Sequence, residues 1–311
     1  MKKLLFIYNP NAGKGLLKPR LSDIFDIFVK AGYEVTVYPT QKYRDGYKKV
    51  AHFTGDYDLL VCSGGDGTLD EVVTGMMKRE NRIPIGYIPT GTTNDFAKSL
   101  HIPRELLKAA DVAVNGEVFS CDVGRFNKDI FVYIAAFGLF TDVSYQTKQE
   151  VKNVLGHLAY VLEGTKRLFN IPSYHIKVTH DGEVIEDDFI FGMVTNSRSV
   201  GGFKNMVGKN VVFDDGEFEA TLIKKPKNPL ELQGIILALV SEQQDSKYMY
   251  SFKTKKVTFE SLEEISWTLD GEFGGEHDNV VIRNAQKELQ IMVDAECKSS
   301  LMAYPEEIEE E

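Results

Sequence analysis

The sequence predicts an α/β N-terminal domain with a parallel sheet and nucleotide-binding glycine turns, followed by a mainly antiparallel β-sandwich. Strand-like and helix-like segments alternate over the first 120 residues, and glycine-rich turns follow the apolar strands. From residue 123 onward, strand-like runs are separated by Asp-Gly turns. The 311 residues suit two domains. We expect residues 1–120, with the tail 297–311 packing back on them, to form one domain, and residues 121–296 to form the other.

The elements of the first domain are predicted from hydrophobic spacing. Strands are expected at residues 3–8, 34–38, 59–62 and 85–88, and helices at 16–31, 44–53 and 69–77, with a further helix beginning at 94–97. Gly32 is expected to end the first helix. Because strands alternate with helices, we expect a parallel sheet with helices on both faces.

The second half carries antiparallel strand signals at residues 123–136 and again at 174–293. The turns are marked by Asp181-Gly182, Asp215-Gly216 and Asp270-Gly271. Two helices are predicted within this half, at residues 149–169 and 229–240, and the acidic tail 306–311 is expected to fray.

Composition excludes several classes of function. The net charge of −10 argues against nucleic acid as a partner, because proteins that bind nucleic acid usually carry a basic excess. The apolar run at residues 4–8 is shorter than the ~7–15 residues of a secretory signal, and no run approaches the ~18 residues of a membrane span. Three cysteines without metal-type spacing are interpreted as reduced residues of a cytoplasmic protein.

Three predicted strands end in loops suited to phosphate, at residues 9–15, 63–68 and 89–95. Glycines let a backbone turn sharply and approach a ligand, and a following helix N-terminus favours an anion. Asp66 lies in the second loop, where a carboxylate beside a phosphate indicates a divalent cation between them. Simple tight turns would explain any one loop, whereas three at one sheet edge indicate a metal–nucleotide site. The loops do not fit the Walker or protein-kinase patterns.

The segment Asp270-Gly271-Glu272 follows a predicted strand and brings two carboxylates together. It is interpreted either as a general base with a supporting carboxylate or as a hairpin turn with exposed acids. Asp122 stands where the pattern changes, and by itself is more typical of a turn acid than of a catalyst.

Together these residues resemble the diacylglycerol kinase catalytic-domain family, which includes soluble bacterial lipid kinases and the sphingosine and ceramide kinases. The resemblance spans nearly the whole chain, in the family's order. It is carried by Asn9-Pro10…Gly13, Gly64-Gly65-Asp66-Gly67-Thr68, Pro89…Gly91-Thr92…Asn94-Asp95-Phe96-Ala97, Asp122…Gly124, Leu155-Gly156…Ala159-Tyr160, Gly201-Gly202, Asp215-Gly216 and Asp270-Gly271-Glu272. The glycine motif alone is shared with NAD kinases, whereas the ordered set is specific.

The resemblance implies roles for particular residues. Glu272 resembles the family's general base, and Asp270, Asp122 and Asp66 resemble the acidic group around the catalytic magnesium. A second, structural magnesium is implied at the Asp215 side chain and the carbonyls of Val212 and Glu217. The positions that resemble nucleotide-binding residues are Asn9, Pro10, Asn11, Ala12, Gly13, Thr40, Gly64, Gly65, Asp66, Gly67, Thr68, Leu69, Asp70, Glu71 and Thr92. Asp70 departs from the family pattern, which usually has Asn there.

The implied function is an ATP- and Mg²⁺-dependent lipid kinase whose acceptor is a lipid alcohol, with diacylglycerol giving phosphatidic acid as the expected reaction. An NAD kinase-like phosphotransferase and a non-catalytic nucleotide- or lipid-binding regulator are the alternatives. A cytoplasmic enzyme without an anchor must contact the inner face of the membrane transiently. Basic segments at residues 224–227 and 253–256 are candidates for that contact or simply solvated loops. The sequence leaves a homodimer open.

Overall fold

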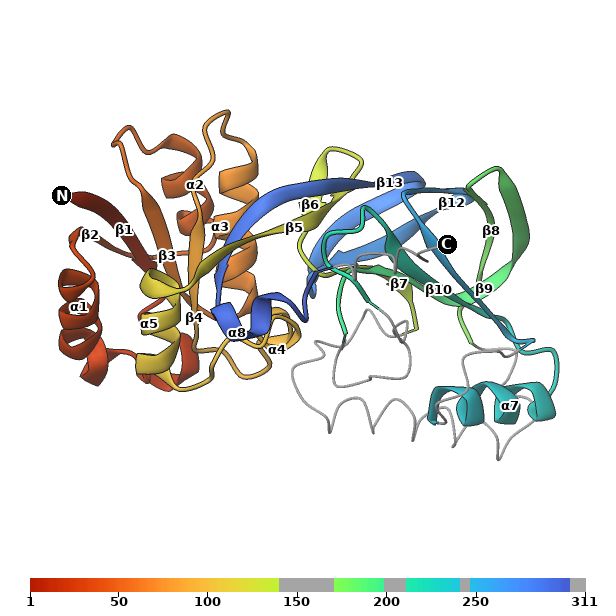
Figure 1. Ribbon diagram of the computed structural model, residues 1–311. Coiled ribbons are helices and arrows are strands. Elements are labelled where there is room, and N and C mark those ends of the chain that lie inside the picture. Colours follow the sequence, from red (N-terminus) through yellow and green to blue (C-terminus); the bar gives the residue numbers. More distant parts are fainter. Residues whose placement is uncertain (140–170, 199–210, 241–246, 303–311) are drawn as a thin grey trace, which may run out of the picture. The chain divides into compact units, whose positions relative to one another are not determined.

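The computed structural model describes residues 1–139, 171–198, 211–240 and 247–302, which divide into two compact units (Figure 1). Unit 1 comprises Met1–Val123, Val212–Gly216 and Ala285–Glu311, and unit 2 comprises Gly124–Val211 and Glu217–Asn284. Residues 212–216 and 285–296, which the sequence assigned to the second domain, therefore belong to unit 1. These two segments are held in unit 1 because the buried carboxylate of Asp122 accepts backbone N–H groups from both of them, those of Gly216 and Lys287.

Unit 1 is built on a sheet whose strands are β1 (Lys2–Tyr8), β2 (Tyr33–Pro39), β3 (Leu59–Gly64) and β4 (Ile85–Pro89). β1 pairs in parallel with β2 and β3, and β3 pairs in parallel with β4. The far end of β13 (Glu272–Val293) joins β4 through Ile291 and Ile85, which gives the order β13-β4-β3-β1-β2. Every residue of β3 and β4 is buried, as expected for central strands covered on both faces.

Helices cover both faces of this sheet. They are α1 (Leu21–Lys30), α2 (Asp45–His52), α3 (Asp66–Met77), α4 (Asp95–Ser99), α5 (Leu106–Asn115) and α8 (Ala295–Lys298). α1 packs against α5 and α2 packs against α3, with the two pairs on opposite sides of the strands (Figure 1). The strand order therefore reverses between β1 and β3, and in open parallel sheets ligands bind at the carboxyl ends of strands at such a position.

The helices differ from the sequence prediction most clearly at α1, α3 and α5. α1 starts five residues later than predicted, because the short 3₁₀ helices η1 (Ala12–Gly15) and η2 (Lys18–Arg20) precede it. Gly15 has φ of +80° and Pro19 stands in η2, and neither residue suits a continuous α-helix. α3 starts at Asp66, three residues early, and α5 was not predicted.

Unit 2 is antiparallel, as predicted for the second half. Its strands are β6 (Asp129–Phe131), β7 (Ile134–Gly138), β8 (Tyr174–His180), β9 (Glu183–Thr195), β10 (Phe218–Lys224), β11 (Met249–Thr254) and β12 (Lys256–Leu269), together with the end of β5 (Glu117–Phe126) and the start of β13. β7 and β8 both pair with β9 and with β12, so they lie end to end in one slot of the sheet. The Asp181-Gly182 turn joins β8 to β9 as predicted, and both of its residues have positive φ.

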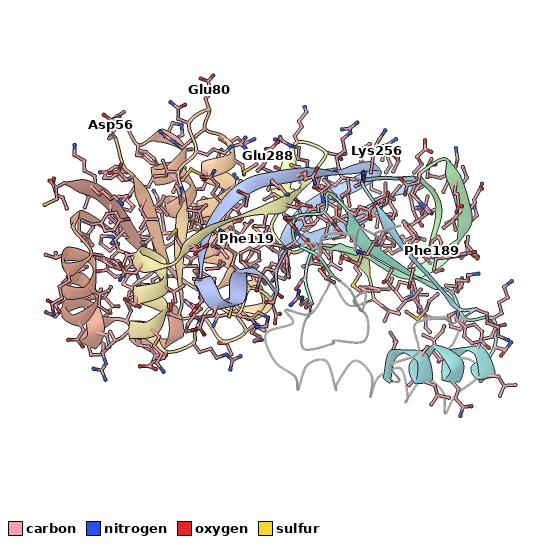
Figure 2. All side chains as sticks on the ribbon, viewed as in Figure 1. Asp56, Glu80, Phe119, Phe189, Lys256 and Glu288 are labelled. Atoms are coloured by element: carbon pink, nitrogen blue, oxygen red, sulfur yellow. The ribbon has the colours of Figure 1, made fainter. Side chains whose placement is uncertain are left out.

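An aromatic core fills unit 2. Trp267 is fully buried, and its ring lies 4.8 Å from that of Phe137 and 5.1 Å from those of Phe126 and Phe259. The sheet curls over this core, since the ring of His180 on β8 stacks on Phe252 of β11, three strands away in the sheet order. Figure 2 shows that apolar and charged side chains are separated: Phe119 and Phe189 are buried, while Asp56 and Glu80 are exposed to solvent.

α7 (Pro229–Val240) joins β10 to β11 and agrees with the helix predicted at residues 229–240. The predicted helix at 149–169, the Gly201-Gly202 segment and the acidic tail lie outside the described residues. Within the described part of the chain, no helix is long and apolar enough to cross a membrane.

Candidate functional site

Three loops meet at the carboxyl edge of the unit 1 sheet and are hydrogen bonded to one another. The Asn9 N–H donates to the Ser63 carbonyl at 2.9 Å, and the Thr90 N–H donates to the Gly64 carbonyl at 2.8 Å. Thr40, which follows β2, donates its N–H to the Tyr8 carbonyl at 2.9 Å. The loops predicted at the ends of β1, β3 and β4 are therefore neighbours in unit 1.

The glycines of these loops allow the backbones to touch. A Cβ on Gly91 would lie 2.6 Å from the Cα of Gly65, and a Cβ on Gly13 would overlap the carbonyl of Thr90. A Cβ on Gly64 would collide with the side chain of Thr68. Side chains are excluded here, so the surface that these loops offer is largely backbone N–H and C=O, which suits phosphate.

Asn94 holds the third loop in shape. Its backbone is left-handed, with φ of 50°, and its amide bonds both polar groups of one residue: Oδ1 accepts the Gly91 N–H at 3.0 Å and Nδ2 donates to the Gly91 carbonyl at 2.7 Å. The buried Tyr87 hydroxyl donates to the Gly64 carbonyl at 3.2 Å. This buried tyrosine and asparagine fix the spacing of the two glycine turns, and neither was among the predicted site residues.

Asp66, the first residue of α3, is the most perturbed acid of the site. Burial, and next the charge of Asp95, raise the pKa of the Asp66 carboxyl to about 6, while N–H groups of Asn94, Asp95 and Phe96 act in the opposite direction. The carboxylate therefore meets the start of α4. Asp95 itself is buried and paired with Lys98 at 2.8 Å.

Three buried oxygens at this edge have no hydrogen-bond partner among the described residues: Asp66 Oδ1, Ser63 Oγ and Thr90 Oγ1. Hard cations such as Mg²⁺ take oxygen ligands and keep several waters, so this donor set fits such an ion with a nucleotide phosphate. No cluster of three or more His, Cys, Asp or Glu able to hold a metal occurs among the described residues. Phosphate and water oxygens would thus have to complete the coordination.

Three other predicted nucleotide positions, Leu69, Asp70 and Glu71, serve the local fold. Glu71 caps the start of α2, because Oε1 accepts the Arg44 N–H at 2.6 Å and Oε2 accepts the Gly46 N–H at 3.0 Å. Leu69 is buried in the core. Asp70 Oδ1 accepts from the Thr74 hydroxyl one turn along α3, at 3.4 Å. Thr92 is exposed beside the third loop, as is Asn11 in the first.

Asp122 is a buried crosslink within unit 1. Its Oδ2 accepts the Gly216 N–H at 2.7 Å and its Oδ1 accepts the Lys287 N–H at 2.8 Å. The Asp122 N–H donates to the Phe213 carbonyl at 2.7 Å. Both carboxylate oxygens are thus used to join β5, residues 212–216 and β13. Of the predicted structural metal ligands, Val212 and Asp215 belong to this unit 1 segment and Glu217 belongs to unit 2.

Asp270 and Glu272 lie in unit 2, at the turn between β12 and β13. Asp270 and Gly271 have φ of 51° and 87°, which is the two-residue hairpin geometry. Asp270 is 4% exposed, and its carboxylate accepts three consecutive N–H groups, those of Val132, Tyr133 and Ile134, at 2.6 to 3.0 Å. Of the two interpretations of this turn, the one with exposed acids does not hold for Asp270, which is buried, while Glu272 is exposed.

Comparison with known proteins gives one consistent result. The model of the diacylglycerol kinase catalytic domain matches residues 3–126. The diacylglycerol kinase of Staphylococcus saprophyticus is 35% identical over 277 residues, covering 88% of this chain and 90% of the relative. That of Bacillus subtilis is 34% identical, with 88% and 91% covered. A crystal structure of a putative diacylglycerol kinase from Bacillus anthracis superposes with a TM-score of 0.78 at 28% identity, covering 94% of this chain and 97% of that one.

Proposed function

The chain belongs to the diacylglycerol kinase family, a family of lipid kinases, and we propose that it transfers the γ-phosphoryl group of ATP to the hydroxyl of diacylglycerol, giving phosphatidic acid. The observation that carries the proposal is the junction of three glycine loops beside the buried Oδ1 of Asp66, which has no hydrogen-bond partner in the described part of the chain. Phosphoryl transfer needs positioning and charge neutralisation more than covalent chemistry. Backbone N–H groups of the junction would position the phosphates, and Mg²⁺ held at Asp66 would neutralise their charge.

The nucleotide is assigned to unit 1. Backbone N–H groups of the loops at residues 9–13 and 64–68 would bind its phosphates, with Thr40 and Thr92 at the margins of the site. Bound Mg²⁺ would neutralise phosphate charge, with Asp66 Oδ1 as a direct or water-mediated ligand. Glu71 acts indirectly by capping α2, since both its oxygens are already hydrogen bonded.

The acceptor is assigned to unit 2, with Glu272 as the general base. In the transfer, the lipid hydroxyl loses its proton to Glu272, the hydroxyl oxygen bonds to the γ-phosphorus, and the bond to the β-phosphate oxygen breaks to release ADP. Asp270 supports the base by fixing the turn that carries it, and Asp122 has the matching role in unit 1, because their oxygens accept backbone N–H groups. Both roles differ from direct metal binding.

The remaining expectations complete the proposal. A structural magnesium would use the Asp215 carboxylate and the carbonyls of Val212 and Glu217; the Glu217 carbonyl also accepts from Asn284 Nδ2 at 3.3 Å. The enzyme acts in the cytoplasm and contacts the inner face of the membrane transiently. A homodimer is compatible with this scheme.

The test is a kinase assay with purified protein, Mg²⁺, γ-labelled ATP and mixed micelles of diacylglycerol. Labelled phosphatidic acid is the expected product, and its formation should require Mg²⁺. Phosphorylated NAD in a parallel reaction would favour the NAD kinase-like alternative. Nucleotide binding by folded protein without any phosphorylated product would favour the non-catalytic regulator.

A further inference from the structure

α7 has apolar side chains on two faces, although it lies at the surface of unit 2. Leu232, Ile235 and Leu239 are at most 2% exposed. On another side of the same helix, Leu230 is 76% exposed and Leu237 is 60% exposed. Leucines seven residues apart share a helix face, so these two form an apolar pair directed at solvent. A surface helix normally presents polar residues there.

Three lysines flank α7 in the sequence. Lys225 and Lys227 immediately precede α7, and with described residues neither ammonium group forms an ion pair. Lys247 lies near the helix, because its ammonium is 4.9 Å from the centre of the Tyr248 ring, and that ring packs directly on Gly234 of α7. The one acid in the helix, Glu231, accepts the Lys227 backbone N–H at 2.7 Å. The apolar face is thus bordered by positive charge on a chain with a net charge of −10.

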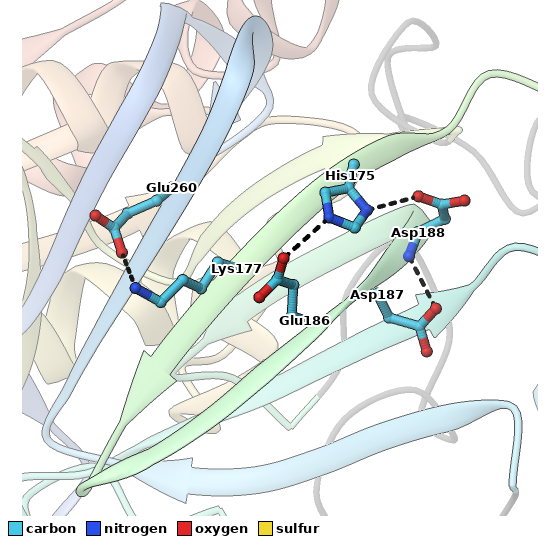
Figure 3. A network of polar contacts seen from close by, with 6 residues as sticks. All are labelled: His175, Lys177, Glu186, Asp187, Asp188 and Glu260. Carbon is cyan, nitrogen blue, oxygen red and sulfur yellow. Dashed lines mark hydrogen bonds and ion pairs between the residues drawn. The ribbon is translucent and has the colours of Figure 1, made fainter.

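Three acids of β9, Glu186, Asp187 and Asp188, are already paired. On β8 and β9 the His175 ring contacts Asp188 at 2.9 Å and Glu186 at 3.2 Å (Figure 3). Asp187 pairs with Lys224 at 3.7 Å, and Lys224 also lies over the Tyr250 ring. The Lys224 side chain therefore belongs to this network. Lys225 contacts it through its backbone N–H, which donates to the Asp188 carbonyl, and not through its ammonium group. The charges of Lys225 and Lys227 are available to an external anion.

We propose that α7, together with Lys225, Lys227 and Lys247, is a surface that docks on an anionic lipid bilayer. The inference rests on the proposed function, because a kinase without a spanning helix among its described residues must meet its lipid at the bilayer surface. Leu230 and Leu237 enter the boundary between headgroups and acyl chains, and the lysines contact anionic headgroups. Leucines without lysines would suit a second copy equally well, and the flanking positive charge is what selects the membrane.

The experiment measures binding of the full chain to sedimented vesicles without ATP. Vesicles of phosphatidylcholine with about 30% phosphatidylglycerol are compared with vesicles of phosphatidylcholine alone. Leu230→Gln/Leu237→Gln should weaken binding to the anionic vesicles by at least about tenfold, since two leucines lose apolar burial. Lys225→Gln/Lys227→Gln should weaken it by on the order of tenfold, and should abolish most of its salt dependence.

Matched controls come from exposed residues elsewhere. Val29→Gln on α1, where Val29 is 61% exposed, and Lys128→Gln should leave vesicle binding unchanged. Each α7 variant should keep its melting temperature and its turnover of a short-chain diacylglycerol dispersed in water. If the wild-type protein does not phosphorylate the short-chain diacylglycerol, the proposed function is overturned. If both α7 variants bind the anionic vesicles as well as the wild type does, the docking surface is overturned. A wild-type dimer that the leucine variant converts to a monomer, with vesicle binding intact, would assign the face to a second copy.

Discussion

Asp270 and Tyr133 are joined twice: Asp270 Oδ1 accepts the Tyr133 N–H at 2.9 Å, and the Tyr133 hydroxyl donates to the Asp270 carbonyl at 3.2 Å. The other bonds of the carboxylate, to Val132 and Ile134, extend this contact to three successive amides. A residue proposed to serve catalysis is thus embedded in the backbone of unit 2, two positions before the exposed Glu272.

Asp270→Asn should destabilise the protein by roughly 2–4 kcal/mol, because an amide NH₂ would face a buried N–H donor and the charge-assisted bonds would be lost. Urea unfolding followed by tryptophan fluorescence reports this change, since the single Trp267 lies in the unit 2 core. Asp181→Asn is the matched control, because Asp181 occupies the same left-handed position of an Asp-Gly turn with its side chain 54% exposed. Equal losses in the two variants would contradict the buried role of Asp270.

Glu272→Gln should reduce kcat by at least about a hundredfold while leaving ATP affinity and the melting temperature close to wild type, because an exposed amide folds normally and accepts no proton. Kinase assays and titration calorimetry with ATP measure the two effects separately. Glu276→Gln, an exposed acid on the same strand, should be fully active. A fully active Glu272→Gln would reassign the base.

Gly91→Ala should raise the KM for ATP and destabilise the protein by roughly 1–3 kcal/mol, since the new Cβ would lie 2.6 Å from the Cα of Gly65 and the loops must separate. Gly65→Ala probes the same contact from the other side, where the Cβ would meet the Gly91 Cα at an ordinary 3.4 Å. The melting temperature of Gly65→Ala should therefore stay near wild type. Equal melting temperatures for the two variants would show that the loops do not touch in this way.

Asp66 should make the stability of the metal-free protein depend on pH. Its folded pKa of about 6 lies above the unfolded value of about 3.9, so the folded state holds the proton more tightly. The contribution of Asp66 to stability is therefore largest below about pH 4 and is lost as pH rises through about 6. In chelator at pH 7, Asp66→Asn should be more stable than wild type by up to ~3 kcal/mol, with lower kinase activity. If the change in unfolding free energy between pH 4.5 and pH 7 is the same in wild type and in Asp66→Asn, the pH dependence does not come from Asp66.

Much of the fold follows from local sequence pattern. The strands of unit 1 and the loops after them are marked by apolar runs and glycines, and α7 and the Asp-Gly turns of unit 2 are equally local. α5 was not predicted, although five of its ten residues are buried, and α1 was drawn too long because 3₁₀ turns share its apolar spacing.

The roles of the acidic residues were harder to predict, because the role of a carboxylate depends on which backbone groups, distant in the sequence, it binds in the fold. Asp122 accepts the N–H of Lys287, 165 residues away, and Asp270 accepts that of Val132, 138 residues away. No local pattern distinguishes such an acid from one that binds metal. Glu71 shows the same limit, since its partners belong to a different helix, 25 and 27 residues back in the chain.

The order in which the ribosome makes the chain has a consequence for unit 1. Ile291 of β13, which pairs with Ile85 of β4, and Lys287, which binds Asp122, are translated only after the whole of unit 2. The sheet that carries the three glycine loops is thus incomplete while unit 2 is being synthesised. A nascent chain halted before residue 285 lacks an edge strand beside β4, and unit 1 becomes complete only at the end of synthesis.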